Sequence, residues 1–184
     1  MKIDCITLFP EMFAPLEHSI IGRARKNSLI DFKTIFLRDF AINDYGQVDD
    51  APYGGEPGMV LRPEPLAQAI RSTGVRDNKG TVIYLTADGQ PLTHQIAKEL
   101  SKKEHLVLVC GHYKGIDERI RETEIDMEIS IGDFVVSGGE LPAMVLTDAV
   151  GRLLEGALGN KESGETDSFA QGLLGWPVYT RPEV

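Results

Sequence analysis

Long apolar runs, clustered cysteines and paired histidine motifs are all missing from this sequence of 184 residues. No apolar run reaches the roughly 18 residues that span a bilayer, and the N-terminus lacks the features of a signal peptide. The two cysteines, Cys5 and Cys110, lie in separate apolar strand-like runs, which predicts buried free thiols. Without HExxH or CxxC motifs, a zinc site is not predicted. We therefore expect a cytoplasmic protein with no membrane segment and no metal site.

Basic residues are also scarce. The chain has 19 lysines and arginines against 28 aspartates and glutamates, a net charge of −9. The imbalance is concentrated in residues 110–184, which hold 6 basic and 14 acidic side chains. Because proteins that bind nucleic acids normally present a basic surface, the charge by itself argues against an RNA partner.

The common phosphate-binding and nucleophile motifs are absent. Neither GxGxxG nor GxxxxGK[ST] occurs, so the usual dinucleotide and nucleotide-triphosphate loops are not predicted. A GxSxG elbow is missing as well, which weakens a serine hydrolase interpretation.

What is present is an alternation of apolar strand-like runs and helical patterns. Pro15 is expected to break the second segment, Asp88-Gly89 to close a strand, and Pro91 to open a helix with an apolar stripe. This alternation predicts an α/β domain with a mainly parallel sheet flanked by helices. The expected strands are 2–9, 32–37, 81–86, 106–110 and 125–136, and the expected helices are 11–26, 64–71, 91–100 and 141–154.

Unusual residues follow three of the predicted strands. These are the segments TADG at 86–89, GHYKG at 111–115 and SGGE at 137–140, and 11 of the 19 glycines fall in residues 110–184. In parallel sheets, ligands bind beyond the carboxyl ends of the strands. The glycine-bearing loops are therefore either plain turns or the walls of one ligand pocket, and their position on neighbouring strand ends favours the pocket.

Three other patterns have an ordinary structural interpretation beside a functional one. Asp148 and Arg152 are spaced as an ion pair on a helix surface. Asp167 begins the stretch Asp-Ser-Phe and could serve as a helix N-cap. The segment Tyr53–Gly58 is either a turn or a substrate loop.

Taken together, the motifs resemble one family closely. The segments LFPEMF (8–13), VDDAPYGGEPGM (48–59), YLTADGQPL (84–92), CGHYKGIDERI (110–120), EISIGDFVVSGGELPAMVLTDAVGR (128–152), DSFAQGLL (167–174) and YTRPEV (179–184) occur in the same order as in bacterial tRNA (guanine-N1)-methyltransferases. These enzymes belong to the SPOUT superfamily of methyltransferases. Each segment alone is weak, but the ordered series covers nearly the whole chain.

The resemblance implies a SPOUT fold with a deep C-terminal trefoil knot and S-adenosylmethionine as the cofactor. It also implies methylation of guanine N1 at position 37, in the anticodon loop of tRNA. The cofactor-binding residues that it implies are Tyr84, Leu85, Thr86, Gly111, Tyr113, Gly115, Ile131, Gly132, Asp133, Phe134, Val135, Val136, Gly138 and Gly139.

Guanine N1 carries a proton at neutral pH, so its methylation requires a proton acceptor and a cation near O6. The resemblance assigns these catalytic roles to Asp167 and Arg152, and it places Gly55, Gly58 and Ser168 at the substrate. It also implies a homodimer whose active site is shared between subunits, so that Asp167 serves the partner's cofactor.

The sequence departs from the family pattern in its length and at several positions, one of which bears on a metal site. It ends at Val184, which predicts a catalytic domain over residues 1–160 and a flexible linker over residues 161–184, without the C-terminal tRNA-binding domain of the family. We therefore expect the chain to bind the cofactor but to methylate tRNA only weakly. Lys114 stands where many members have glutamate, so the sequence does not support a Mg²⁺ site there. Two alternatives stay open: a non-catalytic nucleotide-binding module and a SPOUT ribose 2′-O-methyltransferase.

Overall fold

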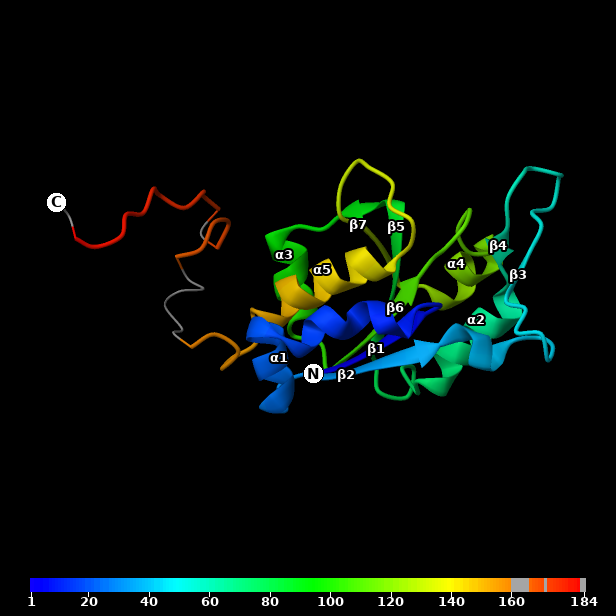
Figure 1. Cartoon of the computed structure of the whole chain (residues 1–184), viewed down its shortest axis with the longest axis horizontal. Coiled ribbons are helices and arrows are strands. Elements are labelled where there is room, and N and C mark those ends of the chain that lie inside the picture. The colour runs from blue at the N-terminus through cyan, green and yellow to red at the C-terminus, as the bar shows by residue number, and fades with distance from the viewer. Residues whose placement is uncertain (160–165, 171, 183–184) are drawn as a thin grey trace.

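The protein is described by a computed structural model that covers residues 1–159, 166–170 and 172–182. Its centre is a parallel sheet with the strand order β2-β1-β6-β5-β7 (Figure 1). The strands are β1 (Lys2–Thr7), β2 (Asp31–Phe36), β5 (Thr81–Pro91), β6 (His105–Cys110) and β7 (Met127–Ser130), and a small antiparallel pair is formed by β3 (Asp49–Asp50) and β4 (Val60–Leu61).

Helices cover both faces of the sheet, as expected for parallel strands that are buried on both sides. The 3₁₀ helix η1 and helices α1, α3 and α5 pack on one face, and η2, α2 and α4 lie on the other (Figure 1). Their bounds are η1 (Pro10–Glu17), α1 (Ser19–Lys26), η2 (Leu37–Phe40), α2 (Pro63–Ser72), α3 (His94–Leu100), α4 (Glu118–Glu124) and α5 (Glu140–Gly151).

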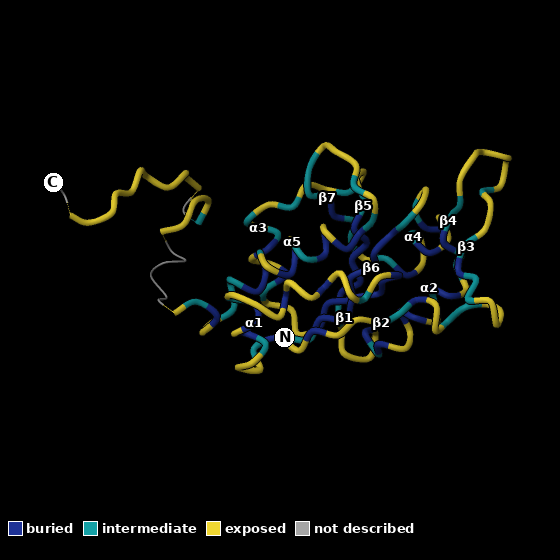
Figure 2. The backbone as a smooth tube through the Cα atoms, in the orientation of Figure 1, coloured by how far each residue is buried: buried dark blue, intermediate teal, exposed yellow. Residues whose placement is uncertain are grey.

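Strand β6 shows how the two cores are divided. All six of its residues are buried (Figure 2). Successive side chains in a strand point to opposite faces of the sheet. Leu106 and Leu108 pack beneath α5, whereas Val107 and Val109 belong to the other core. The apolar run LVLVC is therefore continuous, rather than alternating, because both faces are covered. Cys110 and Cys5 are buried free thiols, as predicted, with their Sγ atoms 3.5 Å apart.

The predicted end of β5 at Asp88-Gly89 is wrong. The strand runs to Pro91, and both Leu85 and Gln90 pair with Ile129, so residues 86–89 bulge out of the ladder. Gly89 permits this bulge, because a Cβ there would lie 2.6 Å from the Glu128 carbonyl carbon.

The helix predicted to open at Pro91 begins later. Pro91 is the last residue of β5, and α3 starts at His94. Its N-cap is Thr93, whose Oγ1 accepts a hydrogen bond from the Ile96 amide at 3.2 Å.

Two further predictions need correction. The helix expected over 11–26 is a 3₁₀ helix followed by α1, and the break falls at His18. Because Pro15 cannot donate a backbone hydrogen bond, a continuous α-helix is not available there. The strand expected over 125–136 is only the short β7, since the chain turns away where Gly132 adopts a φ of +150°. Helix α4 is not among the predicted elements.

The α/β class and the mainly parallel sheet are confirmed. The predicted linker over 161–184 falls partly on residues 160–165, 171 and 183–184, which lie outside the described residues. The neighbouring described residues, 172–182, contain no helix or strand and are exposed.

Candidate active site

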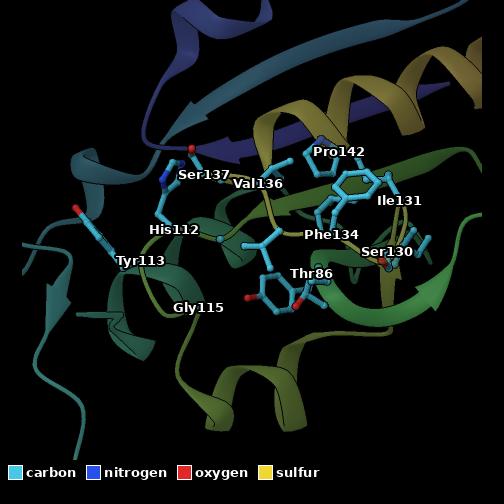
Figure 3. A pocket seen from close by; sticks show the side chains of 18 of the residues that line it. Thr86, His112, Tyr113, Gly115, Ser130, Ile131, Phe134, Val136, Ser137 and Pro142 are labelled. Atoms are coloured by element: carbon cyan, nitrogen blue, oxygen red, sulfur yellow. The ribbon is translucent and has the colours of Figure 1, made fainter. Parts of the chain in front are cut away.

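The carboxyl ends of β6 and β7 and the middle of β5, where its bulge begins, meet around one hollow with a volume of about 650 Å³, open solvent included (Figure 3). The loop after β6 forms one wall, and the loop between β7 and α5 forms the other. The hollow is lined by Tyr84, Leu85, Thr86, Ala87, Gly111, His112, Tyr113, Lys114, Gly115, Ile129, Ser130, Ile131, Gly132, Phe134, Val135, Val136, Ser137, Gly138, Gly139 and Pro142.

Glycines allow the two walls to approach each other. The Gly139 amide donates to the Gly111 carbonyl oxygen at 2.9 Å, and His112 and Gly138 form an isolated antiparallel bridge. A Cβ on Gly139 would lie 2.5 Å from the Cys110 Cα, which no backbone could accommodate without moving. The contact between the loops therefore depends on the missing side chain at this position.

Every residue that the resemblance placed at the cofactor lines this hollow, except Asp133. The exposed loop residues Phe134 and Val135 are among them. Sequence reasoning missed Ala87, His112, Lys114, Ile129, Ser130, Ser137 and Pro142, all of which lie within or next to the quoted motifs. For His112, Lys114, Ser137 and Pro142, their place in the segments GHYKG and SGGELP was the signal, and the other three residues lie in TADG and EISIGDF.

A charged cluster lies behind the wall that carries His112. The carboxylate of Glu140 accepts hydrogen bonds from Thr7 Oγ1 at 2.6 Å and lies 2.8 and 2.9 Å from His112 Nε2. Burial alone would raise the pKa of Glu140, but the hydrogen bonds from His112 and Thr7 outweigh this effect and keep the pKa below its ordinary value. Glu140 is therefore a buried, ionised carboxylate.

Tyr84 lines the hollow from β5, two residues before the bulge at residues 86–89. Burial raises the pKa of its phenol, and the hydrogen bond with Thr86 and the nearby Arg121 offset this only in part. The Arg121 guanidinium lies 5.8 Å from the centre of the Tyr84 ring and forms an ion pair with Glu128 at 2.6 Å. The phenol is thus neutral at physiological pH and presents an aromatic surface.

The two predicted catalytic side chains lie together, but not at this hollow. Arg152 and Asp167 form an ion pair with a 2.5 Å distance between Nη2 and Oδ2. They line a second hollow between α3, α5 and residues 167–169, which shares no lining residue with the first. Ser168 lies there as well, and its Oγ accepts from the Gly175 amide at 2.9 Å.

Helix α5 sets the separation of the two hollows. Pro142 lines the first hollow near the start of the helix, and Arg152 lines the second just beyond its end. Ten residues of α-helix correspond to about 15 Å. The surface pair expected between Asp148 and Arg152 is replaced by the Arg152–Asp167 pair, although the Arg152 amide does bond to the Asp148 carbonyl oxygen. Asp167 caps no helix in the described part of the chain.

The predicted substrate residues Gly55 and Gly58 lie in the exposed loop between β3 and β4. Both have positive φ angles, +83° and +115°. Gly58 lies against Lys114, since a Cβ there would approach the Lys114 Cγ to 2.9 Å. This loop therefore borders the first hollow, on the side away from the Arg152–Asp167 pair.

Two features are absent from the described residues. No group of three or more His, Cys, Asp and Glu side chains among them is arranged to hold a metal ion. Nor does any helix in that part of the chain have the length and apolar character to cross a membrane.

Comparisons with known proteins agree with this architecture. The family model described as "tRNA (Guanine-1)-methyltransferase TrmD" matches residues 1–184. Proteins named tRNA (guanine-N(1)-)-methyltransferase from Staphylococcus aureus strains MRSA252 and JH9 are each 54% identical over 183 residues, covering 99% of this chain and 74% of theirs. The crystal structure of tRNA (m1G37) methyltransferase from Aquifex aeolicus superposes with a TM-score of 0.82 at 40% identity, over 99% of this chain and 76% of that one. The chain therefore belongs to the TrmD family of tRNA (guanine-1)-methyltransferases.

Proposed function

We propose that this chain transfers a methyl group from S-adenosylmethionine to N1 of guanine 37 in the anticodon loop of tRNA. The observation that carries the proposal is the hollow between residues 84–87 of β5 and the glycine-bearing loops after β6 and β7, in a chain of the TrmD family. Tyr84 offers an aromatic face there, and Gly111 and Gly139 allow the two loops beside it to pack closely against each other. These features suit an adenosyl group, which combines a flat heterocycle with polar edges.

S-adenosylmethionine supplies an activated methyl group when it is bound. The residues expected to hold it are the loop residues 111–115 and 131–139 together with Tyr84–Thr86. Their role is to orient the donor and to exclude water, because the cofactor provides the reactive group and the protein provides geometry.

Arg152 and Asp167 supply the two charges that the guanine requires. The N1–H donor and the O6 acceptor are neighbours on one edge of guanine, and the paired guanidinium and carboxylate present a donor and an acceptor side by side. Asp167 would accept the N1 proton as the methyl group arrives. Arg152 would stabilise the negative charge that develops on O6, for which a permanently protonated side chain is suited.

A homodimer explains how two separate hollows could form one active site. Within one chain the two share no lining residue and lie at opposite ends of α5. A second copy related by two-fold symmetry can bring Asp167 of one subunit to the cofactor hollow of the other. The trefoil knot, the cytoplasmic location and the domain division at residue 160 stay predictions.

The proposal is tested by separating cofactor binding from turnover. Calorimetric titration with S-adenosylhomocysteine should show binding, and Asp167→Asn should leave that binding intact while it lowers kcat at least 100-fold, as loss of a general base does. Mass spectrometry of the digested tRNA should place the methyl group on N1 of guanine 37. The absence of binding at millimolar ligand, or a methyl group on a ribose 2′-oxygen, would refute the proposal.

A further inference from the structure

We propose that Glu140 is a positioning residue for the cofactor hollow, which it serves by holding His112 and Thr7 so that the two glycine loops keep a fixed spacing. This inference deepens the function proposed above and rests on it. Glu140 does not line the hollow, whereas His112 does. The carboxylate therefore acts through the imidazole rather than on the ligand.

The contacts of Glu140 join three separate segments of the chain. Its side chain is 1% exposed at the start of α5, and its partners come from the end of β1 and from the loop after β6. Thr7 Oγ1 donates to Glu140 Oε1 and accepts from the Phe9 amide at 2.9 Å. The Thr7 hydroxyl thus connects Glu140 to the segment that follows β1 through two hydrogen bonds.

His112 is held from several sides. Its Nε2 meets both carboxylate oxygens of Glu140, and its ring centre lies 5.0 Å from that of Phe9. A Cβ on Gly138 would come within 2.3 Å of the His112 Cε1 atom, so the ring lies directly against the backbone of the second loop. Figure 3 shows His112 beside Ser137 at the edge of the hollow. The orientation of this ring therefore sets the gap between the walls.

The buried charge of Glu140 requires that its hydrogen-bond partners stay in place, because burying a charge without partners costs free energy. A carboxylate with almost no exposure is stable only when its oxygens are hydrogen-bonded, and here both oxygens have partners. Its position in the first turn of α5 adds a favourable interaction with the helix dipole. The remaining titratable group that faces it is the Cys110 thiol, whose pKa is raised chiefly by burial, with Cys5 and Glu140 adding to the rise.

Removing the carboxylate should release the imidazole. In Glu140→Ala, His112 loses its partner and can turn toward the hollow, and the Gly138 backbone loses the surface it packs against. We expect the Kd for S-adenosylhomocysteine to rise about tenfold or more, which is the scale of a lost charge-assisted hydrogen bond. Thr7→Val, which removes one hydrogen bond at nearly constant volume, should weaken binding less.

The experiment compares these variants with Glu124→Ala. Glu124 is also a largely buried carboxylate, paired with Arg71 at 2.7 Å, but it lies in α4 and does not line the cofactor hollow. The Glu124→Ala variant should lower the unfolding temperature as Glu140→Ala does, yet leave the Kd for S-adenosylhomocysteine unchanged. In turnover assays, Glu140→Ala should raise the KM for S-adenosylmethionine while kcat at saturation stays within about threefold of the unchanged chain, because the reacting groups are untouched.

A double variant tests whether Glu140 acts through His112. If it does, Glu140→Ala combined with His112→Ala should bind no more weakly than the weaker single variant. Three results would overturn the inference. The losses of affinity in the two single variants could add in the double variant, or both Glu140→Ala and Thr7→Val could keep a Kd within twofold of the unchanged chain. The third is a loss of affinity in Glu124→Ala equal to that in Glu140→Ala. Failure of the unchanged chain itself to bind S-adenosylhomocysteine would instead overturn the proposed function, and this inference with it.

Discussion

Single residues decide how closely the walls of the hollow beside β5, β6 and β7 approach each other. Gly139 is the sharpest case, because the atoms that a Cβ would meet belong to the backbone of Cys110 and Gly111 and cannot rotate away. Its φ of −77° is ordinary, so the requirement for glycine there comes from contact and not from backbone conformation.

We predict that Gly139→Ala forces the loops apart and raises the Kd for S-adenosylhomocysteine at least tenfold, with a loss of stability typical of an overpacked site, about 1–3 kcal/mol. Gly159→Ala is the matched control, since a Cβ there meets nothing within 4 Å. Calorimetry and urea denaturation measure both quantities. Equal Kd values for the two variants would contradict the role assigned to the Gly139 contact.

The ionised state of Glu140 has a consequence for stability in acid. Because its folded pKa lies below the ordinary value of 4.5, the unfolded chain takes up the proton first as the pH falls. The stabilisation is therefore complete above pH 4.5 and is lost as the pH drops through the folded pKa.

We predict that the free energy of unfolding, followed by urea denaturation from pH 6 to pH 3, falls less steeply in Glu140→Gln than in the unchanged chain. The exposed Glu104→Gln provides the comparison and should follow the unchanged chain. A Glu140→Gln curve parallel to that of the unchanged chain would mean that this carboxylate does not contribute to acid sensitivity.

At the scale of elements, apolar continuity made most of the sheet predictable. Strands β1, β2 and β6 and helices α2 and α5 lie within a few residues of the positions that the sequence indicates. The misses have local causes. Helix α4 has a single buried apolar side chain, Ile120, so its sequence shows no helical repeat of apolar residues. The extension of β5 past Asp88-Gly89 depends on pairing with β7, which a local turn signal cannot reveal.

Helix α2 offers a test of which of its faces is buried. Leu66 is fully buried in the core between α2 and the sheet, and Gln68, two residues along, is exposed. We predict that Leu66→Ala lowers the free energy of unfolding by about 2–5 kcal/mol, whereas Gln68→Ala changes it by less than about 0.5 kcal/mol. Urea denaturation distinguishes them, and similar losses would contradict the assignment of the buried face.

At the scale of the whole molecule, the sequence located the loops of the site but not its assembly. The glycine-rich strand ends pointed to one pocket, and the structure brings nearly all of the expected residues to it. The roles of Arg152 and Asp167 came from the family resemblance alone. No pattern in the sequence could indicate that the ion pair of these two residues lies at one end of α5 and the first hollow at the other.

A mixing experiment tests the shared site. One chain carries Asp167→Asn and keeps an intact hollow, and the other carries Gly139→Ala and keeps Asp167, with S-adenosylmethionine held far below the Kd of the Gly139→Ala chain. If each subunit serves its partner's cofactor, random exchange makes half of the dimers mixed, each with one complete site, and restores about a quarter of the wild-type activity. If both parts act within one chain, the mixture should stay as inactive as its components.

The position of β1 within the sheet has a consequence for the order of synthesis. Residues 2–7 are flanked by β2 on one side and by β6 on the other, and β6 is not complete until residue 110. A nascent chain must therefore keep its first strand half-paired from the completion of β2 at residue 36 until residue 110 has been made. Such distant pairing slows folding and leaves an apolar edge open to chaperones in the meantime.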